Sequence, residues 1–156
     1  QVFIQNNTVT NNDIGIEVAS ENFQKLTEEV WVESNTVINS IYAGLAVGGY
    51  DEQRGGVRQI TLVNNTVTNN DLGKQQGGQL LLQFNIQQLA IKDNTFTSSP
   101  SRYIIIANQL DRGEVSFQNN RYLPHNSNSS LIWVLGNKEF NSSRAFEKCA
   151  VLQQCK

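Results

Sequence analysis

A short pattern recurs five times along this chain of 156 residues. Its clearest copy, residues 60–71, reads ITLVNNTVTNND, and residues 3–13 repeat it almost unchanged. Each copy contains an Asn, here called the anchor, that directly precedes a Thr or an Arg. The anchors are Asn7, Asn35, Asn65, Asn94 and Asn120, at intervals of 28, 30, 29 and 26 residues. A repeat of this length indicates stacked units that are each too small to bury their own apolar face.

Apolar residues recur at fixed distances from the anchors. They stand five and three residues before each anchor and two residues after it, as Ile60, Leu62 and Val67 do around Asn65. This alternation predicts a strand with one buried face. A second short strand is expected in each unit, over residues 16–18, 45–47, 80–82, 103–106 and 131–134. Because these rows match although the loops differ in length, equivalent strands should lie side by side and parallel, with one coil per repeat.

This pattern resembles the right-handed parallel β-helix of the pectate-lyase-like superfamily. The resemblance covers residues 1–135 and implies an all-β, single-stranded coil of about five rungs, closed by a C-terminal capping segment over residues 136–156. The anchors fit it, since Asn side chains stacked at a turn about 4.8 Å apart can hydrogen-bond along the coil. A structural ladder is therefore favoured over a ligand-binding role for Asn7, Asn35, Asn65, Asn94 and Asn120.

Length and charge agree with one domain and exclude some partners. A chain of 156 residues lies within the usual size of a single domain. A formal net charge of −2 gives no long-range attraction for nucleic acid, and no apolar run is long enough to span a bilayer. No signal peptide is visible. The sequence starts inside a strand, so we expect another segment of a longer chain, or another protein, to cover the first rung.

The tail and the Asn-X-Ser/Thr triplets bear on the compartment. In the tail, Ser142 or Ser143 is a candidate helix N-cap, and Phe146, Cys149 and Ala150 share one helical face. Cys149 and Cys155 are the two cysteines and can close a small disulfide loop, remain thiols, or pair with other parts of the protein. Possible glycosylation sites are Asn6, Asn64, Asn128 and Asn141. Both features favour an extracellular or cell-surface location.

Two Gly-flanked loops interrupt the coil, at residues 48–56 and 73–78. If they leave the coil at equivalent corners, they form one rim where binding residues can gather. The candidate binding residues on this rim are Tyr50, Asp51, Glu52, Arg54 and Lys74. The alternative is that these are ordinary solvated loops.

Catalytic equipment of the superfamily's known enzymes is not recognisable in this stretch. Asp13 and Asp71 occupy equivalent positions two rungs, or about 9.6 Å, apart, at the loose end of the spacing of inverting glycosidases. They are weak catalytic candidates, because Asn-Asn-Asp before an apolar residue and Gly is above all a turn sequence. His125 stands alone, without a second His or Cys nearby to suggest a metal site.

Two functional hypotheses follow. The first is a non-catalytic extracellular module, acting as a rigid spacer or recognition surface in a larger adhesion or matrix protein, with carbohydrate as a candidate partner. It is similar in this respect to the β-helix repeats of large invertebrate junction proteins such as Anakonda. The alternative is the C-terminal part of a polysaccharide lyase, hydrolase or epimerase, for which calcium would be the cofactor of the lyase case. Sugar would then stack on Trp31, Tyr42, Tyr50 or Trp133.

Overall fold

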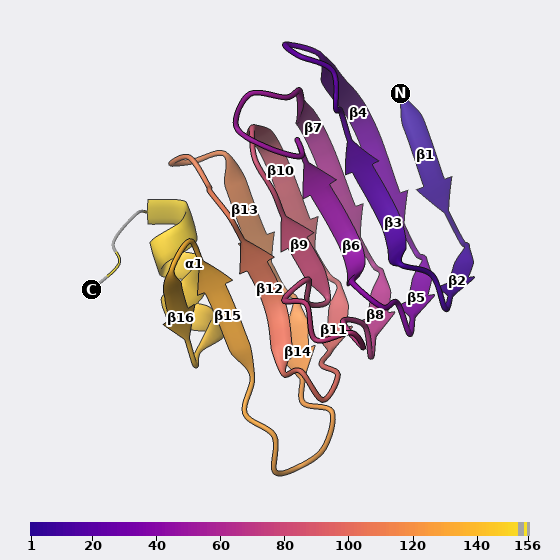
Figure 1. Cartoon of the computed structure of the whole chain (residues 1–156), viewed down its shortest axis with the longest axis vertical. Coiled ribbons are helices and arrows are strands. Elements are labelled where there is room, and N and C mark those ends of the chain that lie inside the picture. The colour runs from indigo at the N-terminus through magenta and orange to yellow at the C-terminus, as the bar shows by residue number, and fades with distance from the viewer. Residues whose placement is uncertain (153–154, 156) are drawn as a thin grey trace.

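The chain folds as a right-handed parallel β-helix of about five coils with one short C-terminal helix (Figure 1). The computed structural model describes residues 1–152 and 155. Each coil contributes one strand to each of three sheets, here called A, B and C. Sheet A contains β1 (Val2–Gln5), β4 (Leu26–Glu33), β7 (Gly56–Val63), β10 (Ile86–Lys92) and β13 (Val115–Gln118). Sheet B contains β2 (Thr8–Thr10), β5 (Thr36–Ile38), β8 (Thr66–Thr68), β11 (Thr95–Thr97) and β14 (Arg121–Leu123).

Sheet C completes each coil and also holds the C-terminal strand. It contains β3 (Ile14–Ala19), β6 (Ala43–Gly48), β9 (Leu80–Leu82), β12 (Tyr103–Ala107), β15 (Ile132–Leu135) and β16 (Lys138–Phe140). All pairs between coils are parallel, whereas β16 runs antiparallel to β15. The expectation of two strands per coil is therefore wrong. The stretch around each anchor is two strands, one in sheet A and one in sheet B.

A single left-handed residue divides these two strands. The residue before each anchor has a positive φ of 53° to 56°; these are Asn6, Ser34, Asn64, Asp93 and Asn119. Asn and Asp tolerate this conformation better than most residues, because their short side chains can hydrogen-bond locally. The chain turns sharply there, so the apolar positions before and after the anchor belong to different sheets that both face the coil interior.

The anchor Asn side chains form a continuous ladder along the coil. Nδ2 of Asn65 donates to Oδ1 of Asn94 at 2.9 Å, and the backbone N–H of Asn65 donates to the same oxygen at 2.9 Å. Corresponding hydrogen bonds between side-chain amides join Asn7 to Asn35, Asn35 to Asn65, and Asn94 to Asn120, at 3.0 to 3.1 Å. Asn35, Asn65 and Asn94 are buried. The ladder thus satisfies the backbone groups that the turn leaves without strand partners.

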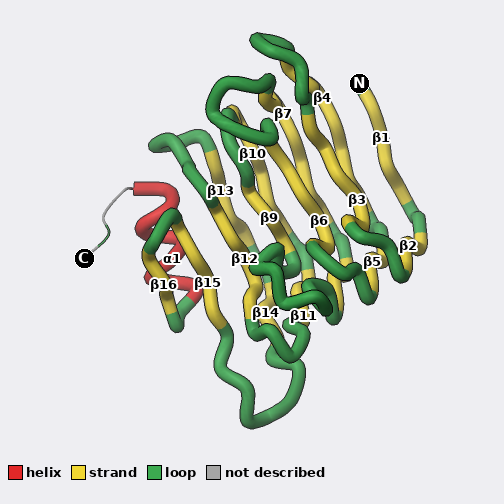
Figure 2. The backbone as a smooth tube through the Cα atoms, in the orientation of Figure 1, coloured by secondary structure: helices red, strands yellow, loops and turns green. Residues whose placement is uncertain are grey.

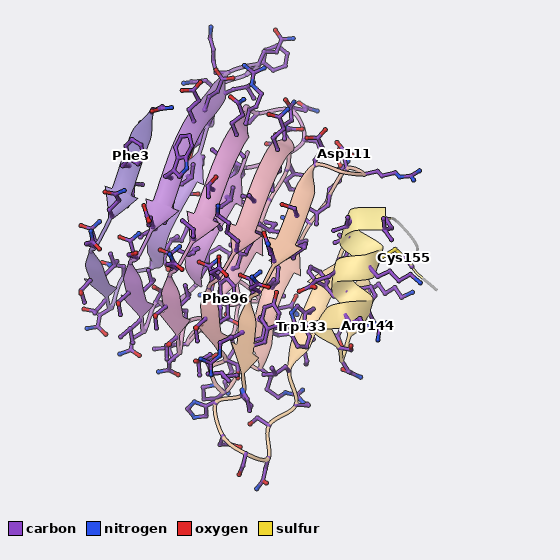
Figure 3. The ribbon with its side chains drawn as sticks, turned by 180° about the vertical axis from the view of Figure 1, so that it is seen from behind. Phe3, Phe96, Asp111, Trp133, Arg144 and Cys155 are labelled. Atoms are coloured by element: carbon purple, nitrogen blue, oxygen red, sulfur yellow. A yellow bond between two sulfur atoms is a disulfide. The ribbon has the colours of Figure 1, made fainter. Side chains whose placement is uncertain are left out.

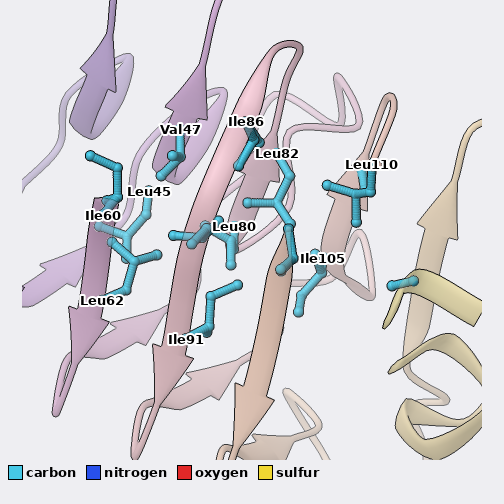
Figure 4. Close-up of a cluster of buried hydrophobic side chains, with 14 of the residues drawn as sticks. Leu45, Val47, Ile60, Leu62, Leu80, Leu82, Ile86, Ile91, Ile105 and Leu110 are labelled. Carbon is cyan, nitrogen blue, oxygen red and sulfur yellow. The ribbon is translucent and has the colours of Figure 1, made fainter. Parts of the chain in front are cut away.

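The core is the column of inward side chains from the three sheets. Figure 4 shows Leu45, Ile60, Leu62, Leu80 and Ile91 pointing into this column. In the second coil Val32, Val37 and Leu45 are at most 1% exposed, whereas their equivalents Ile4, Val9 and Ile16 in the first coil are only partly buried. Each coil therefore completes the burial of its neighbour, as expected for a solenoid.

The C-terminal end of the coil is closed by helix α1 (Ser143–Leu152). Phe146, Cys149 and Ala150 are its buried residues. The Phe146 ring makes edge-to-face contacts with Phe117 and Phe140, at centroid distances of 5.7 and 5.8 Å. Cys149 and Cys155 form a disulfide. Figure 3 shows Cys155 beside the helix, at the end of the molecule opposite Phe3.

The loops leave the coil at two different corners (Figure 2). Residues 20–25 and 49–55 connect sheet C to sheet A, and residues 69–79 connect sheet B to sheet C. The prediction of one rim is therefore wrong for Lys74, which lies at the other corner from Tyr50, Asp51, Glu52 and Arg54. The reason is the third strand of each coil, which places the 73–78 loop one corner away from the 48–56 loop.

Candidate functional site

Two hollows lie on the outer side of sheet A and at the corner that leads into it. A loop cleft of about 530 Å³ opens at the corner and is lined by Phe23, Gln24, Lys25, Leu26, Glu52, Gln53, Gly55, Asn85, Ile86, Gln87 and Asp111. A sheet groove of about 370 Å³ crosses the strands and is lined by Gln1, Glu29, Trp31, Gln59, Ile60, Thr61, Gln88 and Ala90. Gln87 and Gln88 are consecutive residues of β10, so the two hollows adjoin.

A column of three stacked left-handed residues forms one wall of the sheet groove. Glu29, Gln59 and Gln88 have φ of 55°, 57° and 53°, and the strand pairing skips all three without a change of register. A residue in the left-handed region interrupts the regular strand conformation on each of these strands. All three side chains are exposed, and the backbone N–H of Gln88 donates to Glu114 at 2.8 Å. The groove wall is thus a row of amide and carboxylate groups.

An aromatic pair lies beside this wall. The rings of Phe3 and Trp31 are stacked, with centroids 5.4 Å apart and planes 29° from parallel. Phe3 is 54% exposed and projects from β1 (Figure 3). The next positions in the same row are the smaller Thr61 and Ala90. The small side chains leave the groove open next to the Trp31 ring.

Ion pairs lie near these hollows. Glu28 and Arg58 form one on neighbouring strands of sheet A. In the 49–55 loop, Arg54 Nε lies 3.2 Å from Asp51, and the Arg54 guanidinium lies 4.9 Å from the centre of the Tyr50 ring. Backbone N–H groups of Arg54 and then Gln53 hold the pKa of the Asp51 carboxyl below its usual range. The loop cleft itself is lined by charged Lys25, Glu52 and Asp111, whereas the sheet groove offers amides, one carboxylate and the Trp31 ring.

Asn85 fixes the loop above the loop cleft. Its side-chain amide lies within hydrogen-bonding distance of four loop carbonyls, those of Asp51, Glu52, Arg54 and Gly55, at 2.9 to 3.3 Å. Among the predicted binding residues, Glu52 lines this cleft. Tyr50 is 61% exposed on the same loop. Asn85 and the column of left-handed residues carry no predicted role; the recurrence of Glu or Gln six residues before each anchor is the signal that marks the column.

The two catalytic candidates lie in different environments. Asp71 is fully buried; its Oδ1 accepts the Gln75 N–H at 2.8 Å, and its Oδ2 is buried without a hydrogen-bond partner in the described part of the chain. Asp13 is exposed, and its carbonyl accepts the Tyr42 N–H at 2.8 Å. These contacts close turns, as their sequence indicates. An enclosed carboxylate such as Asp71 is not accessible to a polymer substrate.

The other candidate residues are distributed over the surface and the core. Trp133 is 3% exposed inside the coil, which places it out of reach of a sugar. Tyr42 is half-buried, and burial is the main cause of its raised pKa, followed by the charge of Asp71. Asn6, Asn64, Asn128 and Asn141 are all exposed. Their glycosylation stays a prediction.

The described residues contain neither a metal-binding cluster nor a membrane-spanning helix. Within residues 1–152 and 155, no three His, Cys, Asp or Glu side chains come together as a set that could hold a metal ion. Over the same residues, no helix combines the length and apolar character needed to cross a bilayer.

Comparison with known proteins gives one informative relative. The chain is 35% identical over 145 residues to the uncharacterized protein YwoF of Bacillus subtilis strain 168. The match covers 93% of this chain but 31% of that protein. No family model and no solved structure matches. The chain therefore corresponds to about a third of the relative's length.

Proposed function

We propose that this chain is a non-catalytic, extracellular recognition module that binds a neutral polysaccharide along the outer face of sheet A. The observation that carries the proposal is the stack of exposed Phe3 on partly buried Trp31 beside the column of Glu29, Gln59 and Gln88. Aromatic faces provide large apolar contact area, and amide side chains both donate and accept hydrogen bonds. Sugar rings present apolar C–H faces and hydroxyl groups that match this combination.

The form of the groove supports an extended ligand. Its lining residues come from β1, β4, β7 and β10 or lie next to them, so it crosses successive coils. Equivalent groups therefore repeat about every 4.8 Å along the coil axis. A polymer of similar units lying along this axis can repeat its contacts from one coil to the next. Glu29 is the one charged side chain among the described residues that line the groove, so the groove favours a neutral chain over a polyanion.

The disulfide and the possible glycosylation sites support an extracellular location. The Cys149–Cys155 disulfide is typical of oxidising compartments. The exposed Asn-X-Ser/Thr triplets are compatible with the same location. The rigid coil also suits a spacer in a longer adhesion or matrix protein, in which another segment or protein covers the exposed edge of β1, β2 and β3. Covering that edge would bury the partly exposed Ile4, Val9 and Ile16.

The proposal is tested by affinity electrophoresis and calorimetry against a panel of neutral and uronic-acid polysaccharides. Trp31→Ala is expected to weaken binding of a neutral polymer about tenfold, because loss of one stacked ring removes about 1.4 kcal/mol. Gln59→Ala should weaken it less. Ile41→Ala is the matched control, since Ile41 is 48% exposed and lies outside both hollows.

Three outcomes would contradict the proposal. Binding to no polymer of the panel would remove its basis, and equal losses in W31A and I41A would place the ligand elsewhere. Loss in Tyr50→Ala without loss in W31A would move the site to the 49–55 loop. Release of soluble sugar from a bound polymer would favour the carbohydrate-active enzyme, and dependence of that release on calcium would favour the lyase.

A further inference from the structure

The outer face of sheet B carries threonines in a two-dimensional array. The middle residues of its strands, such as Val37, Val67 and Phe96, are fully buried, so the flanking residues point outward. Register pairs Thr8, Thr36, Thr66 and Thr95 in one column, and Thr10, Ile38, Thr68 and Thr97 in the next. Together these eight residues are here called the Thr face. In the last coil Arg121 and Leu123 end the array.

The array is regular in both directions. Within each column, neighbouring residues lie at the strand spacing of about 4.8 Å. The two threonines of one strand, which belong to different columns, are about 6.6 Å apart. Thr is stiff at χ1 because it is branched at Cβ, so its methyl and hydroxyl groups keep a restricted set of directions. Among the seven threonines of this face, Thr10 alone makes a side-chain hydrogen bond within the described residues. Its hydroxyl accepts from the Asn11 side-chain amide at 3.5 Å. The remaining hydroxyls are available to a ligand or to ordered water.

The chemistry of this face differs from that of sheet A. The outer side of sheet A carries Glu28, Arg58, Glu33 and Lys92, and also the two aromatic rings, whereas none of the eight positions of the Thr face is charged or aromatic. An ionic mineral would require charges, and a polysaccharide would favour rings. A surface that repeats one small side chain on two axes fits a partner that is itself periodic on two axes.

We propose that the Thr face binds ice. Its strand spacing is near the a-axis repeat of hexagonal ice, and its spacing along the strand is somewhat shorter than the c-axis repeat. Each hydroxyl can occupy the position of a lattice water oxygen, and each methyl group orders the water between hydroxyls. The Asn ladder directly before these strands fixes their backbone and keeps the array preorganised. Because this face is separate from the sheet groove, the inference does not depend on the proposed polysaccharide binding.

The test measures the fraction of purified protein taken into slowly growing ice and the inhibition of ice recrystallisation. The wild-type chain should concentrate in the ice and keep its crystals small. Thr66→Lys places a long charged side chain in the centre of the array and should abolish both effects. Gln5→Lys is the matched control, because Gln5 is exposed, faces outward from sheet A and lies outside both hollows. Ile38→Thr completes the array and should increase both effects.

Circular dichroism and thermal unfolding establish that each variant is folded before ice binding is compared. Should Thr66→Lys not fold, Thr68→Ser, which removes one methyl group, is expected to lower ice uptake in its place. Wild-type protein that is excluded from ice like any other solute would overturn the proposal. Equal losses in T66K and Q5K would also overturn it. Binding of crystalline cellulose or chitin that T66K abolishes, without ice uptake, would assign the Thr face to a crystalline glycan instead.

Discussion

The hydroxyl of Tyr122 donates to the Glu147 carboxylate at 2.9 Å and so joins the last strand of sheet B to the capping helix α1. The Tyr122 ring stacks on Phe96 and meets Trp133 edge to face, at centroid distances of 5.9 and 5.4 Å. Burial, followed by the charge and hydrogen bond of Glu147, raises the pKa of Tyr122 above its usual value. The closure of the coil therefore depends on a neutral phenol.

This phenol makes the fold sensitive to alkali. A Tyr in the unfolded chain loses its proton near pH 10, whereas the folded state retains it, so the stabilisation is complete below about pH 10 and declines above it. The free energy of unfolding should fall by up to about 1.4 kcal/mol per pH unit in that range. Urea titrations between pH 8 and 11 measure this slope. Tyr122→Phe should flatten it, with a residual slope from Tyr42, whose pKa is also raised; an unchanged slope would contradict the assignment.

Removal of one side chain from the Asn ladder should destabilise the coil. Asn65→Ala leaves the Val32 carbonyl and the Asn35 N–H without their partners. Each buried group left unsatisfied costs about 1 to 3 kcal/mol, so we expect a loss of at least that size in urea unfolding. Asn64→Gly, at the neighbouring exposed position with φ of 55°, is the control and should change stability little. A near-zero effect of N65A would mean that the ladder contributes nothing.

The corner between sheets B and C has no room for a side chain at Gly44. A Cβ there would lie 2.5 Å from Val67 Cγ1 and 2.6 Å from the Gln79 carbonyl of the next coil. Gly44→Ala should therefore cost about 3 kcal/mol, at the upper end of overpacking effects. Gly113→Ala, at φ of 79° but with open space around it, should cost about 1 kcal/mol. Thermal unfolding of both variants tests this order, and a reversed order would rule out the tight corner.

The disulfide should stabilise the cap more than the coil. Cys149 and Cys155 are six residues apart, and closing so short a loop contributes about 2 kcal/mol in the chain-entropy model. The double variant Cys149→Ala, Cys155→Ala is expected to accelerate hydrogen exchange in α1 while leaving the amides of Asn35, Asn65 and Asn94 protected. Equal acceleration throughout the coil would show instead that the cap and the coil unfold as one unit.

The site could be foreseen only in part. The sequence predicts Trp31 as a sugar-stacking residue, and it lines the sheet groove; predicted Glu52 lines the loop cleft. The prediction for Lys74 is wrong about its corner, and no role is predicted for Asn85 or Gln88. These residues belong together only because successive coils place them in register, and their roles depend on neighbours about 30 residues away.

The sequence by itself determined the coil. The anchors and the alternating apolar positions are local signals, and their repetition set the parallel register, as the pairing of Val32 with Leu62 and of Val37 with Val67 confirms. The tertiary structure alone decided where each coil bends. Left-handed Asn6, Asn64 and their equivalents divide one apparent strand into two. This division adds a third sheet, encloses Asp71 and turns the threonines of sheet B outward. Apolar periodicity does not predict it, because it depends on a backbone angle that the periodicity does not encode.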